Sequence, residues 1–81
     1  MERAEVERRV SAVITRVLHL QAGEITPEAN FIFDLGADSL QSLQLVAAFE
    51  EEFGVELDQE AALAVQTVTS AVDFLKATLD R

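Results

Sequence analysis

Apolar residues recur at α-helical spacing in three separate stretches of the chain, and no stretch alternates apolar and polar residues as a half-buried strand would. In the first stretch, Val6, Val10 and Ile14 repeat at i, i+4 and i+8, which places them on one side of a helix. We expect this helix over residues 3–20, with Gly23 ending it. The periodicity predicts an all-α fold.

A second helix is expected after the turn residue Gly36. Asp38 and Gln41, three residues apart, have the spacing of a capping box, and Gly54 marks the end of the periodic stretch 39–53. At about 100° per residue, one side of this helix is apolar and belongs to the core: Leu45, Val46, Phe49 and Phe53. The opposite side would be exposed: Leu40, Gln44, Ala47 and Glu51.

Two more helices follow. Asp58 is a good N-cap for a short, unusually apolar helix through about Val65, and Thr67 caps the last helix. The last helix repeats apolar residues at i, i+4, i+7 and i+11: Val68, Val72, Leu75 and Leu79. The chain is therefore expected to form a small bundle of three main helices plus one short helix, with a long loop between the first two. In that loop we expect a turn at 26–28 and burial of the apolar residues Phe31, Ile32, Phe33 and Leu35.

A chain of 81 residues has the size of one small domain, which we place at 1–81. It carries 15 acidic and 6 basic residues, for a net charge of -9. This charge repels nucleic acid and anionic lipid headgroups, so we expect neither as a partner. Residues 21–60 contain ten Asp or Glu and no Lys or Arg. Solvation explains any one of these acids, but together they suggest that this segment binds basic protein partners.

The residue types also limit the chemistry. The chain has no Cys and one His, which argues against a disulfide framework, a thiolate zinc site and a cysteine nucleophile; we expect no intrinsic metal site. No apolar run approaches the roughly 18 residues that span a membrane, and no signal-peptide pattern follows Met1. We therefore expect a cytoplasmic protein without membrane insertion.

Ser39 is the position that could carry chemistry. It has no GxSxG context, and His19 lies on a different expected helix, which argues against a Ser–His–Asp hydrolase. Its place at the start of a helix, after a Gly turn, favours an attached phosphate, because the first N–H groups and the helix dipole attract negative charge. The alternative is that Asp38 and Ser39 only cap the helix.

The motif DLGADSL at 34–40, followed by EEEF at 50–53 and TV at 67–68, resembles acyl carrier proteins of the fatty-acid or type II polyketide kind. The resemblance covers nearly the whole chain and extends to its length, acidity and expected helix order. It implies a monomeric carrier, not an enzyme. The carrier would deliver acyl intermediates to enzymes of fatty-acid, lipid or polyketide biosynthesis that have basic docking patches.

The resemblance also assigns roles to residues around the motif. Ser39 Oγ would be the attachment point of 4′-phosphopantetheine, donated from coenzyme A by a phosphopantetheinyl transferase that uses Mg²⁺. Asp38 would help to hold that metal at the transferase interface, and Leu40 would make a hydrophobic contact there. The prosthetic arm would supply the thiol for a thioester, which this Cys-free chain lacks.

Two further sets of residues are implied by the resemblance. The acyl chain would be sheltered between the second and third helices by a pocket whose lining includes Phe31, Val46, Phe49, Leu57, Ala62, Val65, Ala71 and Phe74. Transferase and partner recognition would involve Asp38, Leu40, Gln44, Ala47, Glu51 and Leu63. An ordinary core explains the first set equally, and both interpretations can hold together.

The chain departs from this family in its charge pattern. Typical fatty-acid carriers have acids where this chain has Gln41 and Gln44, and Glu60 is the only charge within 59–65. One interpretation is a specialised carrier, whose partners contact an apolar surface centred on Leu63. Neutral drift on a tolerant surface is the alternative.

Two other functions remain open. A peptidyl or aminoacyl carrier would share the helix bundle and the modified Ser, although the Asp directly before Ser39 favours the acyl type. An acidic helical interaction module without a prosthetic group is the alternative from a different class.

Overall fold

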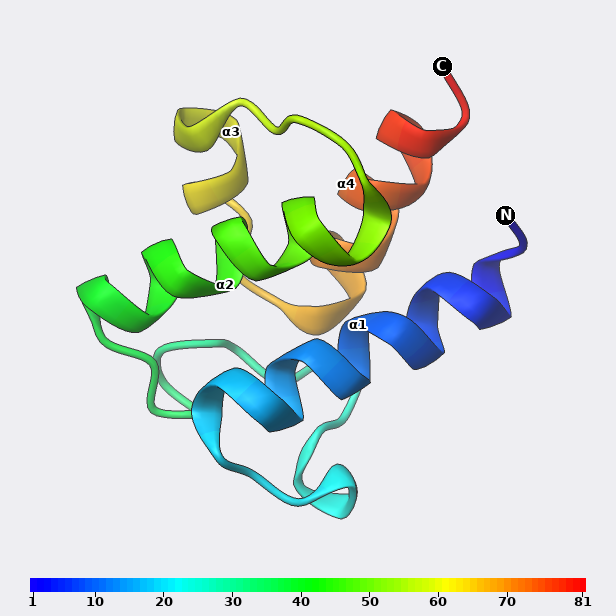
Figure 1. Cartoon of the computed structure of the whole chain (residues 1–81). Coiled ribbons are helices and arrows are strands. Elements are labelled where there is room, and N and C mark those ends of the chain that lie inside the picture. The colour runs from blue at the N-terminus through cyan, green and yellow to red at the C-terminus, as the bar shows by residue number, and fades with distance from the viewer.

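The computed structural model describes residues 1–81, apart from the side chain of Ala22, as a bundle of α-helices (Figure 1). In chain order the elements are α1 (Arg3–Leu18), the 3-10 turn η1 (Ala22–Glu24), α2 (Ser39–Phe53), α3 (Gln59–Leu63) and α4 (Val68–Leu79). The expected all-α bundle of three main helices and one short helix, with a long loop between α1 and α2, is confirmed. Helix α1 packs against both α2 and α4, and α3 lies beside α2.

Helix α1 contributes the most deeply buried part of the core. Its side chains Val6, Val10, Val13 and Ile14 are completely buried, because their spacing places them on the side that faces α2 and α4. Helix α4 adds Val72 and Leu75 at the same depth. These side chains form the part of the core that lies between α1 and α4.

The end of α1 differs from the expectation. The helix ends at Leu18 instead of residue 20, and Gly23 takes no part in ending it. His19 adopts the left-handed conformation, with φ of 57°, and its N–H donates to the carbonyl oxygen of Thr15. The N–H of Leu20 donates to the same oxygen at 3.1 Å. A residue other than glycine therefore ends this helix, which composition alone does not reveal.

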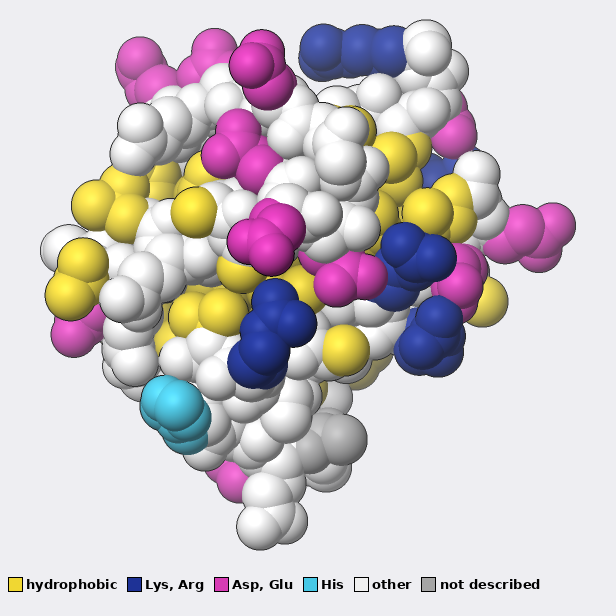
Figure 2. Space-filling view, in the orientation of Figure 1, with side chains coloured by type: hydrophobic (Ala, Val, Ile, Leu, Met, Phe, Trp, Pro, Cys, Tyr) yellow, Lys and Arg dark blue, Asp and Glu magenta, His cyan; other side chains and the backbone are white. Residues whose placement is uncertain are grey.

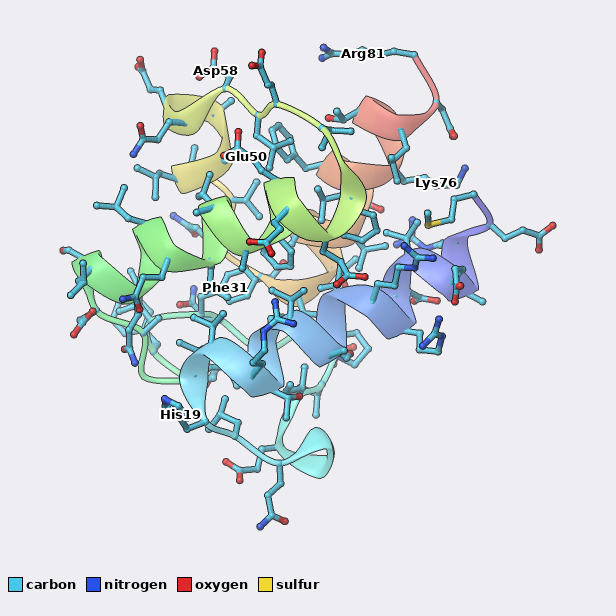
Figure 3. All side chains as sticks on the ribbon, in the orientation of Figure 1. His19, Phe31, Glu50, Asp58, Lys76 and Arg81 are labelled. Carbon is cyan, nitrogen blue, oxygen red and sulfur yellow. The ribbon has the colours of Figure 1, made fainter. Side chains whose placement is uncertain are left out.

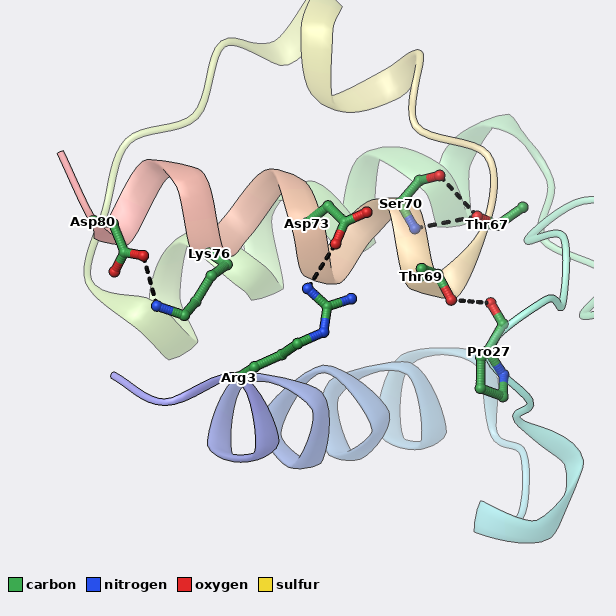
Figure 4. Close-up of polar contacts among 8 residues, drawn as sticks. All are labelled: Arg3, Pro27, Thr67, Thr69, Ser70, Asp73, Lys76 and Asp80. Atoms are coloured by element: carbon green, nitrogen blue, oxygen red, sulfur yellow. Dashed lines mark hydrogen bonds and ion pairs between the residues drawn. The ribbon is translucent and has the colours of Figure 1, made fainter.

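Helices α2 and α4 begin where their caps indicate. Helix α2 has the expected bounds, and Gly54 ends it in the left-handed conformation with φ of 64°. The N–H of Ser70 donates to Thr67 Oγ1 at 3.2 Å, which confirms Thr67 as the N-cap of α4 (Figure 4). Leu45, Phe49 and Phe53 are the buried residues of α2. The division of α2 into a core side and an exposed side is thus confirmed, except that Val46, expected in the core, is half-buried.

Helix α3 is shorter than expected, since it ends at Leu63 and not at Val65. The N–H of Ala64 donates to the carbonyl oxygens of Glu60 and Ala61, both at 3.2 Å, which tightens the last turn. None of the five residues of α3 is buried. After Leu63 the chain leaves the helix, and Val65 is half-buried and packs against the core from outside it.

The loop between α1 and α2 is attached to the start of α4. The N–H of Phe31 donates to the carbonyl oxygen of Gln66 at 2.9 Å, and Asn30 and Thr67 form an isolated antiparallel bridge. Thr69 Oγ1 donates to the carbonyl oxygen of Pro27 at 2.8 Å (Figure 4). The expected turn at 26–28 is present, with the N–H of Ala29 bonded to the carbonyl oxygen of Thr26.

Burial in this loop is only partly as expected. Phe31 is buried and Leu35 is half-buried, but Ile32 and Phe33 are 58% and 87% exposed, so the expectation that both are buried is wrong. The side chain of Asn30 explains the difference, because its Oδ1 accepts hydrogen bonds from the N–H groups of Ile32 and Phe33. This turn holds the backbone of both residues while their side chains project into solvent.

Candidate functional site

The start of α2 is held in place by the turn before it. Gly36 adopts φ of +76°, a conformation that an L side chain rarely adopts. This turn brings the N–H of Ala37 to the carbonyl oxygen of Phe31 at 2.8 Å and buries the Ala37 side chain. Asp34 Oδ2 accepts from the N–H of Asn30 at 2.7 Å. The first half of the DLGADSL motif therefore forms the turn that sets where α2 begins.

Asp38 and Gln41 form the capping box that their spacing predicts. Asp38 Oδ1 accepts from the N–H of Gln41 at 2.7 Å, and Gln41 Oε1 accepts from the N–H of Asp38 at 3.2 Å. Gln41, which departs from the charge pattern of fatty-acid carriers, thus has a structural role here. Both ends of the box are occupied without any contribution from the side chain of Ser39.

Ser39 is the first residue of α2 and is exposed. Its hydroxyl makes no hydrogen bond to another described residue, whereas the nearby Ser42 Oγ donates to the carbonyl oxygen of Asp38 at 2.9 Å. Asp38 therefore caps the helix, as the alternative predicted, whereas the Ser39 side chain takes no part in the cap. An exposed hydroxyl free of intramolecular bonds is accessible to a modifying enzyme.

The backbone around Ser39 can also accommodate negative charge. Within the described chain, the N–H groups of Ser39 and Leu40 have no acceptor, since the first capped N–H is that of Gln41. Unpaired N–H groups and the positive end of the helix dipole stabilise a phosphate close to them. The donor set at the start of α2 therefore fits a phosphodiester on the Ser39 oxygen.

A cavity of about 150 Å³ lies next to α2. The structure brings together around it all eight residues of the expected pocket lining: Phe31, Val46, Phe49, Leu57, Ala62, Val65, Ala71 and Phe74. Glu50 helps to position one wall, because its Oε2 accepts from the N–H of Leu57 at 2.8 Å; Figure 3 labels Glu50 between α2 and the segment that leads to α3. Leu57 is held over the cavity by this bond.

The cavity has further lining residues that the sequence did not indicate. They come from the loop, α2, the region of α3 and α4: Asn30, Ile32, Phe33, Ser42, Leu45, Gln66 and Leu75. Ser42 could have been found, since it lies three residues after Ser39 and four before Val46 on one side of a helix. Ile32 and Phe33 could not have been recognised as exposed residues at the edge of the cavity, because a run of large apolar residues in a loop indicates burial.

The expected recognition residues occupy two separate places. Leu40 is 63% exposed on the first turn of α2. Gln44, Ala47 and Glu51 line a shallow hollow between α2 and α1, to which α1 contributes Arg16. Leu63 is not brought to this hollow and instead lies at the rim of the cavity, 43% exposed. Arg16 was missed by the sequence analysis, since only the tertiary structure places it beside the acidic segment.

The acids of the segment 21–60 are largely left without basic partners. Within the part of the chain that the structure describes, Arg3, Arg8, Arg9 and Lys76 form ion pairs, and Glu52 is the one acid of this segment that takes part, through Arg9. Figure 2 shows the acidic side chains over α2 and α3 and most of the basic ones over α1 and the chain ends. The negative field of these acids is therefore directed outward from α2 and α3.

Among the described residues, no group of three or more His, Cys, Asp or Glu could hold a metal ion. Asp34 and Asp38 bond to backbone N–H groups instead. No helix within 1–81 has the length and hydropathy needed to cross a bilayer.

The chain matches the model of a known protein family. The model of the phosphopantetheine attachment site matches residues 8–75, which is most of the chain. The matched range includes the start of α2 and every residue that lines the cavity.

Proposed function

The chain belongs to the phosphopantetheine attachment family, whose domains carry covalent 4′-phosphopantetheine, and from this we propose that it is an acyl carrier protein modified on Ser39 Oγ. The observation that carries the proposal is the unpaired, exposed hydroxyl of Ser39 at a helix start that Asp38 and Gln41 cap without it. Membership of this family also removes the alternative of a module without a prosthetic group.

The residues around Ser39 support this assignment. The N–H groups of Ser39 and Leu40 would hold the phosphate, and Asp38 would stay available to the transferase and its Mg²⁺ through the carboxylate oxygen that the cap leaves free. When attached, the group supplies a thiol that can hold an acyl group as a thioester, which a chain without Cys cannot do by itself. The chain has the role of a carrier and not of an enzyme.

An acyl cargo is favoured over a peptidyl or aminoacyl one by the cavity. Its buried lining residues are apolar, as in Phe31, Phe49 and Leu75, and offer no side-chain hydrogen bond to a peptide group. Asp38 directly before Ser39 supports the same choice. We propose that the single domain 1–81 delivers acyl groups to cytoplasmic enzymes of fatty-acid, lipid or polyketide biosynthesis.

Partner enzymes would dock next to Ser39. The unpaired acids of α2 and α3 would attract basic patches and make association fast and salt-sensitive. Leu40 and Leu63 would add apolar contacts on either side of the cavity, and Gln44, Ala47 and Glu51 would contact the partner through the hollow next to α1. Because the charge at Gln41 and Gln44 is missing, we propose a specialised carrier instead of a housekeeping one.

Intact-mass measurement tests the attachment. Incubation with coenzyme A, Mg²⁺ and a phosphopantetheinyl transferase should add about 340 Da to the chain. Ser39→Ala should abolish the gain, and Ser42→Ala, which alters a serine on the same side of α2, should leave it unchanged. A wild-type chain that gains no mass, or a Ser39→Ala chain that still does, would contradict the proposal.

Turnover by a general ketoacyl synthase tests the specialised role. The loaded chain should be a poorer substrate than a housekeeping acyl carrier protein under the same conditions, because two acids of the usual recognition surface are missing. Gln44→Glu should recover part of the difference. Equal turnover of the two carriers would contradict the proposal of a specialised carrier.

A further inference from the structure

We infer that the cavity accepts, as the buried end of the cargo, only a short, wholly apolar acyl or aryl group of about six carbon atoms. This inference rests on the proposed attachment at Ser39. It names the class of cargo, which neither the family match nor the docking surface specifies.

One side of α2 connects Ser39 with the cavity. Ser42, Val46 and Phe49 follow Ser39 at steps of three, four and three residues, which places the four side chains in one row along the helix. The last three of them line the cavity, whereas Ser39 lies outside it. A group tethered at Ser39 can therefore reach the cavity along α2 past Ser42.

The size of the cavity limits what can enter. An engineered apolar cavity of about 150 Å³ in another protein holds one benzene molecule, and the cavity beside α2 has about the same volume, about 150 Å³. Its lining includes the rings of Phe31, Phe49 and Phe74. A linear chain of about six carbons or a single aromatic ring matches this volume.

The inner wall resists enlargement. Phe31, Phe49, Ala71 and Leu75 are between 1% and 8% exposed, and the close-packed core behind such side chains tolerates inserted volume poorly. The outer rim is different, because Ile32, Phe33 and Leu63 are substantially exposed there. A longer chain would thus leave its excess length outside, against Phe33, instead of extending farther inward.

The inner wall also excludes polar ends. Of the polar residues around the cavity, Ser42 Oγ is committed to the carbonyl oxygen of Asp38, and Asn30 Oδ1 accepts from the N–H groups of Ile32 and Phe33. Gln66 is exposed. A hydroxyl or carboxylate packed against the apolar side chains of Phe31, Phe49, Ala71 and Leu75 would lose its hydrogen bonds to water without replacement there.

A set of loaded chains tests the inference. The transferase would attach butyryl, hexanoyl, dodecanoyl, benzoyl or adipoyl pantetheine arms, and amide chemical shifts would be compared with those of the unacylated arm. Shifts at Ala71 and Phe74 should increase from butyryl to hexanoyl, and benzoyl should shift them comparably. Dodecanoyl should add nothing further there but should shift Phe33, and adipoyl, with its terminal carboxylate, should leave Ala71 unshifted.

Three outcomes would overturn the size and polarity limits: shifts at Ala71 that grow from hexanoyl to dodecanoyl, an adipoyl shift equal to that of hexanoyl, or no shift with any cargo. Intact mass, recorded on every sample, separates these outcomes from failure of the proposed function. A chain that never gains the arm contradicts the attachment at Ser39, and a loaded chain with unshifted cavity residues contradicts only the inference.

Variants of two phenylalanines on α2 provide a matched control. Phe49 lines the cavity, whereas Phe53, one turn later and similarly buried, does not. Phe49→Leu should move the limit beyond hexanoyl, so that dodecanoyl shifts Ala71 further, and Phe53→Leu should not. Val46→Ala, at a half-buried position of the same wall, provides the same test if Phe49→Leu does not fold. An unchanged limit in a folded, loaded variant of either cavity residue would count against the inference.

Discussion

The bundle consists of two unlike regions, which we call the packed half and the open half. The packed half is α1 with α4, where residues such as Val10, Ile14 and Leu75 are at most 1% exposed. The open half is the turn 30–37, α2 and α3, where the cavity has a buried inner wall, as at Phe31 and Phe49, and an exposed rim, as at Phe33. The contrast shows that the packed half is filled, whereas the open half keeps a cavity with an exposed rim, so it can hold a cargo and contact partners.

Charge divides along the same line. In the packed half, most acids and bases are paired, as between Arg3 and Asp73 and between Lys76 and Asp80 (Figure 4). In the open half, Asp58 and Glu60 have no basic partner within the described chain. Exposed ion pairs contribute little to stability. The pairing therefore matters mainly because it leaves the acids of the open half available to another protein.

The largest expected effect compares two identical substitutions. Val10→Ala removes a fully buried side chain of the packed half and should lower the free energy of unfolding by about 2 kcal/mol, from lost burial and the void left behind. Val46→Ala, beside a cavity that already exists, should cost clearly less. Urea denaturation of both variants provides the comparison. Equal losses would show that the two halves do not differ in packing.

A second prediction separates structure from chemistry at the start of α2. Asp38→Ala removes the cap and should cost about 1 kcal/mol of stability, whereas Ser39→Ala should cost almost nothing. Asp38→Asn should keep the cap but slow the transferase, since an amide binds Mg²⁺ less well than a carboxylate. Denaturation and modification rates measure the two effects. An Asp38→Ala variant as stable as the wild-type chain would show that the Asp38 cap does not stabilise α2.

A third, smaller effect concerns the exposed rim of the open half. Phe33→Ser should change the free energy of unfolding by no more than about 0.5 kcal/mol, because the ring is 87% exposed. Thermal or urea denaturation would check this. Asn30→Ala is the contrast, since it removes the oxygen that fixes Ile32 and Phe33 and should destabilise the turn. A large loss on Phe33→Ser would mean that the rim is part of the core.

The smallest effect is electrostatic and belongs to the packed half. A hydrogen bond from Arg8 lowers the pKa of the exposed Glu5 below its ordinary value of 4.5. Because the pKa is lowered in the folded state, the pair stabilises the fold above the unfolded-state pKa, and this is lost as the pH falls through the folded value. Arg8→Gln should raise the pKa of Glu5 in a carboxyl NMR titration, while Arg16→Gln should not. An unchanged pKa of Glu5 in the Arg8→Gln variant would show that Arg8 does not stabilise the Glu5 carboxylate.

The sequence predicted α2 better than the other elements. Its start and end depend on local signals, namely the capping box of Asp38 and Gln41 and the left-handed Gly54, and local signals are present in the sequence. The end of α1 was missed because His19 adopts a conformation that usually belongs to glycine. The end of α3 was missed because apolar residues such as Val65 are turned toward the cavity instead of continuing the helix.

The sequence by itself determined that the chain is helical, where its second helix begins, that Ser39 stands at that start, and that the acids surround it. These properties follow from residue spacing and local hydrogen bonding. Only the tertiary structure decided that the Ser39 hydroxyl is unpaired, that Phe33 is exposed and that the cavity holds about 150 Å³. Exposure and volume depend on how the loop, α2, α3 and α4 pack together, and such long-range packing has no signature in the spacing of neighbouring residues.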